Sequence, residues 1–210
     1  MTAARTPLTP AASADALGLR ERKKLKTRLA IRRATYGLIE SQGYEATTIE
    51  QIADAAEVSP STVFRYFPTK EDIVLTDEYD PVMEAELRDR PLDEPMLESL
   101  RYIITAHVRA ILEQGGEDER KELYVRTKLM IEVPAVRSRM MESMSVTGRL
   151  VCRVIAERTG RDADDLKVRV FAMGVIGSLM EALLYWGEHG CEDDLVALVN
   201  EALDVFKDGW

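Results

Sequence analysis

Apolar residues recur every three to four positions along most of this chain, which is the spacing of one face of an α-helix. The first such stretch begins at Arg20 and ends at Gly43, and glycine often follows the last helical residue. A second begins at Thr47 or Thr48, because each threonine has Glu or Gln three residues later, as a capping box requires. No stretch keeps the alternating pattern of a half-buried strand, so the sequence predicts an all-α fold.

A tight turn separates the second predicted helix from a short third one. Ser59 is a good N-cap, Pro60 suits the first helical turn, and Pro68 ends the helix. Val63 and Phe67 lie four positions apart and are expected to face the core, which leaves polar side chains outside. Two short helices joined by a turn, with polar residues on the exposed side of the second, indicate a helix-turn-helix.

Six more helices are expected, which makes about nine in all. Their predicted ranges are about 69–88, 95–114, 117–133, 134–159, 162–188 and 192–207. The pattern divides the chain into a disordered tail over 1–19, a helix-turn-helix unit over 20–68, and a larger helical body over 69–210. The tail lacks the apolar stretch of a signal peptide.

Composition indicates a globular protein, since 46% of the residues are apolar and 31% are charged. We find no run of about 18 apolar residues, so we expect no membrane span and a cytoplasmic location. Cys152 and Cys191 are far apart and lack metal-ligand spacing. They are expected to be ordinary reduced thiols, with no metal site and no cofactor.

The net charge of −9 hides a division along the chain. Residues 1–75 carry eleven Lys/Arg against nine Asp/Glu, a net of +2, whereas the remainder carries 17 against 28, a net of −11. The segment 20–33 alone has eight basic residues and one acidic residue. Such a segment could be a solvated helix face, but its place just before the helix-turn-helix favours contact with phosphates.

A helix that enters the major groove of DNA needs a narrow contact face that is positive or neutral. Ser61 and Thr62 are short enough to let the third helix approach the bases, and Arg65 can reach guanine edges or phosphates. The residues predicted to contact DNA are Arg28, Thr47, Thr48, Ser59, Pro60, Ser61, Thr62, Phe64, Arg65, Tyr66 and Lys70. Operator DNA in double-stranded form is therefore the expected partner.

The order I31…A34…L38…G43-Y44…T47-T48-I49…I52-A53…A56-E57-V58-S59…T62-V63-F64-R65-Y66-F67-P68-T69-K70-E71-D72 resembles the N-terminal domain of the TetR/AcrR family. The resemblance covers about fifty residues and implies that Ser61, Thr62, Phe64 and Tyr66 face DNA. Two positions depart from the family pattern. Glu57 stands where glycine is usual at the turn, and Phe64 replaces a tyrosine whose hydroxyl would contact a phosphate.

The resemblance also implies that the acidic body binds a small-molecule effector and forms a homodimer. Small residues four positions apart, at Gly174, Ser178 and Ala182, would let two helices approach closely. The residues predicted at the dimer interface are Gly174, Ser178, Ala182, Trp186, Leu195, Val199 and Phe206. An intrachain core is the alternative for this set.

Methionines and aromatic residues in the body are candidates for an effector site, because methionine adapts to irregular ligands. The candidates are Tyr102, His107, Tyr124, Met130, Met144, Phe171 and Met180. The same stripes would equally suit an ordinary helical core.

These observations predict a ligand-responsive repressor that binds a palindromic operator as a homodimer. In this mechanism the effector tilts the fourth helix, which spaces the two reading helices. The alternative is a helical adaptor or an activator that uses the same helix-turn-helix face. An enzyme is not expected, since the chain has two histidines, no phosphate-binding glycine loop and no GxSxG.

Overall fold

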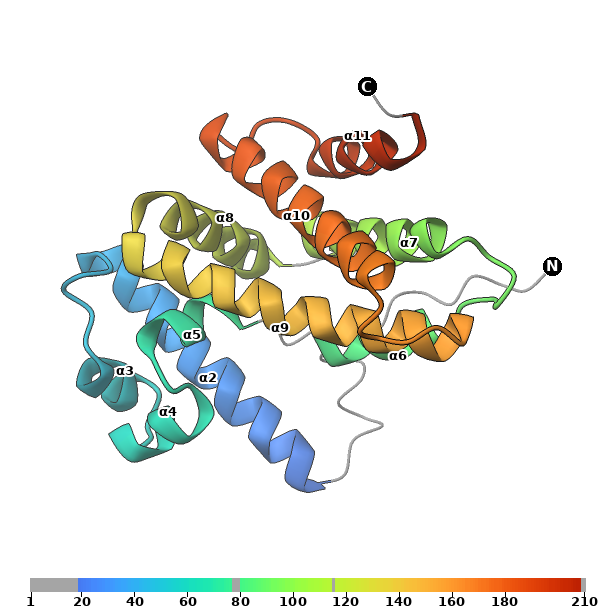
Figure 1. The fold of residues 1–210 in the computed structure, drawn as a ribbon. Helices are drawn as coiled ribbons and strands as arrows, with labels where there is room; N and C mark the ends of the chain where they lie inside the picture. Colours follow the sequence, from blue (N-terminus) through green and yellow to red (C-terminus); the bar gives the residue numbers. More distant parts are fainter. Residues whose placement is uncertain (1–18, 77–79, 115, 209–210) are drawn as a thin grey trace.

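The protein is described by a computed structural model over residues 19–76, 80–114 and 116–208, and within these residues all regular structure is helical (Figure 1). The elements are α2 Leu19–Gln42, α3 Ile49–Ala55, α4 Pro60–Tyr66, α5 Lys70–Leu75, α6 Asp80–Asp89, α7 Met96–Arg109, the π-helical turn η1 Ala110–Gln114, α8 Glu117–Glu132, α9 Pro134–Thr159, α10 Leu166–Glu188 and α11 Leu195–Asp208. The all-α prediction is confirmed. The predicted tail lies almost wholly outside the described residues.

We call α2 to α5 the reader and α6 to α11 the body. The reader contains very short helices, and each begins at a side-chain cap. Thr48 and Gln51 form a capping box at α3, and Thr69 and Asp72 form another at α5. The Ser59 hydroxyl accepts from the Thr62 N–H at the start of α4. Helices of six or seven residues are unstable alone, so these caps and tertiary packing hold them.

A small hydrophobic cluster, which we call the distal core, joins α3 and α4 to α2. Its buried members are Ile31, Ile52, Ala53, Val63, Phe67 and Ile73. Val63 and Phe67 are both fully buried, as their four-residue spacing predicts. The Arg28 guanidinium lies 4.7 Å from the centre of the Phe67 ring and covers its outer side.

The turn between α3 and α4 has a left-handed backbone at Glu57, with φ of 55°. The Glu57 N–H donates to the Asp54 carbonyl, and the Val58 N–H donates to the Ala53 carbonyl. These bonds fix the tight turn that glycine would adopt without steric cost. Glu57, which stands where glycine is usual in the family, therefore adopts a strained backbone conformation.

The predicted helix over 69–88 is wrong, because the structure divides it into α5 and α6. Thr76 ends α5 in an extended conformation, with φ of −66° and ψ of 128°. The sequence explains the division, because Pro81 stands inside the predicted range and proline has no backbone N–H for the hydrogen bonds of a continuous helix. Reader and body are thus not joined by one rigid helix.

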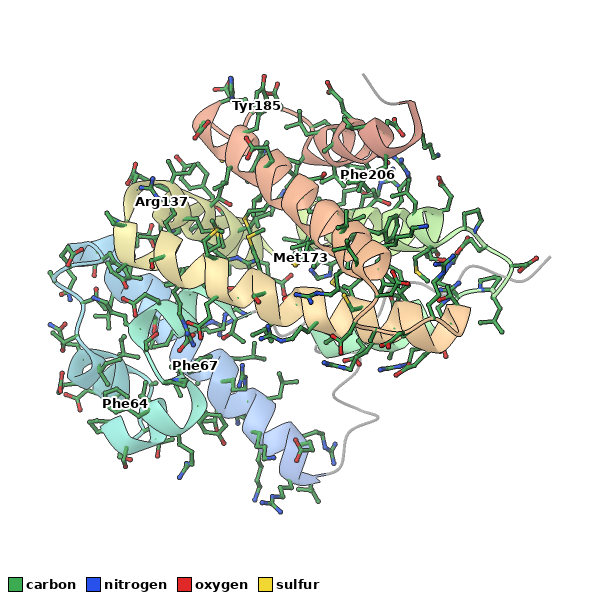
Figure 2. All side chains as sticks on the ribbon, viewed as in Figure 1. Phe64, Phe67, Arg137, Met173, Tyr185 and Phe206 are labelled. Atoms are coloured by element: carbon green, nitrogen blue, oxygen red, sulfur yellow. The ribbon has the colours of Figure 1, made fainter. Side chains whose placement is uncertain are left out.

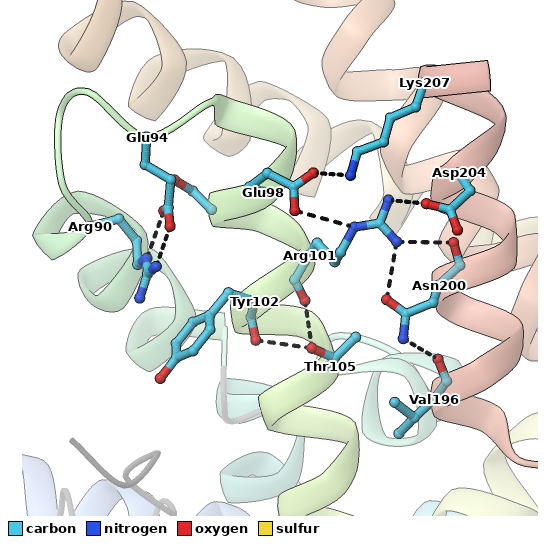
Figure 3. A network of polar contacts seen from close by, with 11 residues as sticks. Arg90, Glu94, Glu98, Arg101, Tyr102, Thr105, Val196, Asn200, Asp204 and Lys207 are labelled. Atoms are coloured by element: carbon cyan, nitrogen blue, oxygen red, sulfur yellow. Dashed lines mark hydrogen bonds and ion pairs between the residues drawn. The ribbon is translucent and has the colours of Figure 1, made fainter. Parts of the chain in front are cut away.

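The body is built around α9 and α10, which lie side by side, with α8 on one side and α11 packed against α10 (Figure 1). Close approach of α10 to α8 depends on Gly187, where a Cβ would lie 2.5 Å from Thr127 Cγ2 and 2.7 Å from Ile131 Cδ1. Polar contacts join α7 to α11: Arg101 donates to the Asn200 carbonyl and side chain at 3.1 Å and to Asp204 at 2.7 Å (Figure 3).

Helix α10 leaves much of its apolar surface uncovered. Its most apolar 18-residue window has a mean hydropathy of 1.5, and 22% of that window is buried. By length and composition alone, α10 passes the test for a membrane-spanning helix among the described residues, contrary to the expectation from the sequence. Large exposed apolar surfaces mark sites of contact with other proteins or with membranes.

Candidate nucleic-acid interface

Helix α4 turns one face to the core and the opposite face to solvent. Val63 and Phe67 are fully buried, whereas Ser61, Phe64 and Arg65 are exposed. Figure 2 labels Phe64 and Phe67. Figure 1 shows α3 and α4 at the end of the molecule away from α11. The exposed face of α4 is therefore free of the body, as a helix must be if it is to enter a groove.

The hydroxyl groups at the start of α4 are organised by contacts with one another. Ser59 Oγ lies 2.9 Å from both Ser61 Oγ and Thr62 Oγ1, and Arg65 Nη2 donates to Thr62 Oγ1 at 3.4 Å. The Arg65 guanidinium also lies 5.4 Å from the centre of the Tyr66 ring, and Tyr66 is half-buried. These contacts direct polar groups along one side of the helix. Pro60 is exposed at its first turn.

The two threonines predicted to contact phosphate have different environments. Thr48 is exposed and caps α3. Thr47 is 1% exposed, and its hydroxyl donates to the Gly43 carbonyl at 2.8 Å. The prediction for Thr47 therefore needs correction, because its side chain is used inside the loop that joins α2 to α3.

Lys70 and Arg28 also act within the reader. The Lys70 ammonium donates to the carbonyls of Tyr44 at 2.8 Å and Thr47 at 3.0 Å, and it lies 3.9 Å from the centre of the Tyr44 ring. It thus ties the α2–α3 loop to α5. Arg28 is half-buried over Phe67. Both are expected to position DNA-contacting groups more than to contact DNA. The Lys70 contacts join residues 23 and 26 positions apart, which no periodicity reveals.

The first turns of α2 carry a basic surface. Arg20, Arg22, Lys23 and Lys26 are all exposed, and Lys24 pairs with Glu21 at 2.8 Å. This surface belongs to the same unit as the exposed face of α4. Its charge gives the reader an attraction for phosphates that the acidic body lacks.

Reader and body meet through a second hydrophobic cluster, which we call the junction core. Its buried members are Ile39, Tyr44, Val74 and Leu75 from the reader, with Leu129, Met130, Val136 and Met140 from the body. Arg139 on α9 donates to Asp72 on α5 at 2.7 Å. Arg32 on α2 pairs with Glu122 on α8 at 3.3 Å, and burial raises the pKa of the Glu122 carboxyl despite that partner. A movement of α8 or α9 would therefore act directly on α2 or α5.

Two family models match the chain. The model described as "Bacterial regulatory proteins, tetR family" matches residues 31–76, and the model described as "MftR C-terminal domain" matches residues 95–210, more than half of the chain. The chain belongs to the TetR family of transcriptional regulators. It is thus a DNA-binding regulator with a helix-turn-helix reader and a ligand-binding C-terminal body.

Relatives support this membership. The chain is 36% identical over 152 residues to the HTH-type transcriptional regulator TcmR of Streptomyces glaucescens, covering 70% of this chain and 67% of that protein. It resembles the structure of Thermus thermophilus FadR in complex with lauroyl-CoA with a TM-score of 0.53 and 24% identity, over 87% and 94% of the two chains. It resembles the Pseudomonas aeruginosa repressor NalD with a TM-score of 0.54 and 23% identity, over 90% and 100%. The two structural likenesses show a shared fold.

Most residues predicted at the dimer interface of this TetR-family body lie inside the single chain. Ala182, Trp186, Leu195 and Val199 are all at most 5% exposed in the body core, because α11 folds back on α10. For these four the intrachain alternative holds.

The other three predicted interface residues are less buried. Gly174 is covered by the Phe206 ring of its own chain, since a Cβ there would lie 3.1 Å from that ring. Ser178 is half-buried and donates to the Gly174 carbonyl, while Phe206 itself is 40% exposed. Only Phe206 of the seven offers a large exposed surface.

The residues predicted to bind the effector do not converge on one place. Tyr102 and Tyr124 are exposed, and the Arg90 guanidinium lies 4.0 Å from the centre of the Tyr102 ring. Met130 is buried in the junction core, against which Met144 and Met180 also pack. His107 is half-buried on α7, and Phe171 meets Phe206 edge to face. The three methionines, which share the junction core, are the ones closest to the reader.

Proposed function

We propose that this TetR-family regulator is a ligand-responsive repressor that binds a palindromic operator as a homodimer. The observation that carries the proposal is the exposed face of α4, with Ser61, Phe64 and Arg65. This face belongs to the reader and not to the acidic body. A single copy of a seven-residue helix reads few base pairs, so two copies related by a twofold axis would be needed for specificity.

The uncovered face of α10 supports a dimer. Leu166, Val170 and Met173 are 74%, 61% and 40% exposed, and they fall at positions that share one side of the helix. Val205 and Phe206 of α11 are 50% and 40% exposed as well. We infer that a second copy covers this surface, which keeps Phe206 of the predicted interface and replaces its buried members. Cover by a second copy, not by lipid, agrees with a cytoplasmic regulator.

Sedimentation of a charged variant tests the dimer. Val170→Glu places a carboxylate in the proposed interface and is expected to yield monomers, whereas Arg120→Glu, at an exposed position of α8 outside that face, is expected to leave dimers intact. A dimer that survives Val170→Glu would contradict this interface.

Selection of bound fragments from genomic DNA tests the operator. A palindrome with half-sites about 34–36 Å apart is the expected result, because two α4 helices must enter successive major grooves. The double variant Arg65→Ala/Thr62→Ala is expected to lose specific binding while remaining a dimer. An unchanged footprint would show that another surface reads the DNA.

The effector is proposed to be a small molecule with an apolar part. The Thermus thermophilus FadR is solved with lauroyl-CoA and the Bacillus subtilis FadR with stearoyl-CoA, and both share the fold of this chain. The methionines against the junction core, Met130, Met144 and Met180, would adapt to such a ligand. A ligand there would shift α8 and α9, on which α2 and α5 rest, and so lower operator affinity by favouring the weakly binding form.

Both acyl-CoA compounds are suitable first probes. A rise in melting temperature together with release of operator DNA would support this effector class. Tight binding of either compound without any change in operator affinity would contradict the repressor mechanism.

A further inference from the structure

Phe64 carries an exposed aromatic ring that is not part of the distal core. Its side chain is 51% exposed, although α4 has only seven residues and its other apolar side chains, Val63 and Tyr66, lie in or against the distal core. Covering an exposed aromatic ring on binding is favourable, because it removes apolar surface from water. The ring is therefore available to a partner.

The neighbours of Phe64 place it at one edge of the exposed face. Ser61 precedes it by three positions, so the two share a side of the helix, and both are exposed. Arg65 is exposed on the far side of Ser61, whereas Val63 and Phe67 are fully buried. A groove that accepts Ser61 therefore also lies close to the phenyl ring.

The chemistry of the ring excludes a polar contact with phosphate. A phenyl group has no hydrogen-bond donor, and phosphate oxygens keep their water unless a donor or a cation replaces it. The major groove of duplex DNA carries one apolar group on its base edges, the C5-methyl group of thymine. An apolar side chain on a helix in that groove is expected to meet this methyl group.

We propose that Phe64 is a specificity-determining residue that reads the C5-methyl group of a thymine in each operator half-site. The inference rests on the proposed function, because it requires α4 to lie in the major groove. Ser61 and Arg65 would then select polar base edges next to this thymine, while the ring adds a preference that no hydroxyl or guanidinium supplies.

The test uses the full-length protein and the operator recovered by genomic selection. Each thymine of one half-site is replaced in turn by deoxyuridine, which removes only the methyl group. At one position wild-type affinity is expected to fall about fourfold, the effect of burying one methyl group. Phe64→Ala is expected to bind the methylated and unmethylated duplexes equally.

Two further variants make the result specific to the ring. Phe64→Leu keeps an apolar side chain and should keep the preference for thymine over deoxyuridine. Ser61→Ala should bind more weakly or equally but retain the full methyl effect. Because Phe64 is exposed, Phe64→Ala is expected to stay folded, which circular dichroism checks.

The inference would be overturned if Phe64→Ala lost affinity by the same factor for every duplex, since the ring would then contact sugar or backbone. It would also be overturned if wild type bound all deoxyuridine duplexes as tightly as thymine duplexes. In both cases operator binding itself would stand. Failure to recover any operator, or insensitivity of binding to Arg65→Ala/Thr62→Ala, would instead overturn the proposed function along with this inference.

Discussion

The distal part of the reader and the body are stabilised in different ways. Helices α3 and α4 have seven residues each, and each is fixed by its own cap and by one small core. Helices α9 and α10 have 26 and 23 residues and are held by a much larger core that unites most of the body. The structure of the distal reader is therefore determined by residues close together in the sequence, whereas the structure of the body depends on which long helices pack together.

Reader and body are not separate at the junction core, where Ile39 and Val74 of the reader pack with Leu129 and Met140 of the body. The second half of α2 and all of α5 thus share a core with α8 and α9. Only α3, α4 and the first half of α2 are independent of the body, and they contain the proposed contacts to DNA.

The largest expected effect comes from emptying the distal core. Phe67→Ala removes a fully buried ring and should lower the free energy of unfolding of this part by about 3–5 kcal/mol. Neither tryptophan of the chain lies in the reader sequence, and Trp186 is buried in the body core, so the fluorescence of Trp186 reports on the body. Circular dichroism should show an early transition that fluorescence does not.

Phe64→Ala is the matched control, since it removes an exposed ring from the same helix and should change stability by less than about 0.5 kcal/mol. If both probes moved together in Phe67→Ala, the distal reader and the body would be one cooperative unit, and the comparison would fail.

Gly187, where α10 lies close to α8, allows the packing of the body to be tested by substitution. In Gly187→Ala the new methyl group meets Thr127 and Ile131, and overpacking should lower the free energy of unfolding by about 1–3 kcal/mol. Gly37→Ala, at an exposed helical position with open space around it, should instead raise stability by about 0.5–1 kcal/mol. Urea unfolding followed by circular dichroism measures both, and a stabilised Gly187→Ala would show that α8 moves easily away from α10.

A smaller effect is expected at the reader turn. Glu57→Gly should stabilise the reader by about 0.5 kcal/mol, because relief of the left-handed strain outweighs the extra freedom of the unfolded chain. Glu50→Gly, in the first turn of α3, should destabilise it by about 1 kcal/mol. Urea unfolding followed by circular dichroism separates the two signs, and equal losses in both variants would mean that the turn is not strained.

The smallest expected effect concerns acid stability of the loop between α6 and α7. Hydrogen bonds from Arg90 lower the pKa of Glu94 to about 2, and Glu94 also accepts from the Ser99 hydroxyl at 2.6 Å (Figure 3). A carboxyl group with a depressed pKa stabilises the fold above its ordinary pKa of 4.5, and this contribution is lost as pH falls towards 2.

Glu94→Gln should therefore flatten the dependence of stability on pH below 4.5, while stability near pH 7 decreases slightly. Asp93→Asn, at an exposed position of the same loop, is the control. Urea unfolding between pH 3 and 7 makes the measurement, and parallel curves for wild type and Glu94→Gln would rule out this role of Arg90.

Sequence patterns predicted the reader well because its determinants are local. The caps at Thr48, Ser59 and Thr69 lie within three residues of their partners, so spacing alone locates three helix starts. The ends of α8 and α9 follow in the same way from Pro134 and Gly160.

Two kinds of feature could not be predicted from sequence patterns. The division at Thr76 does not interrupt the apolar period over residues 69–88, so that period alone does not reveal it. The environments of Lys70 and Trp186 depend on partners brought together by tertiary folding: two loop carbonyls for one, and the fold of α11 against α10 for the other. Burial of this kind cannot be deduced from period alone, since a core face and an interface face have the same spacing.

The division of charge, with basic α2 at one end of the molecule and an acidic body beyond it, has a consequence for encounter kinetics (Figure 1). Near a polyanion such as duplex DNA, a net of +2 on residues 1–75 and −11 on the remainder exert opposite forces. The resulting torque turns the approaching protein so that the reader arrives first, and body-first collisions are repelled. Productive collisions thus form a larger share of all encounters, and this orientational gain fades as salt shortens the range of the field.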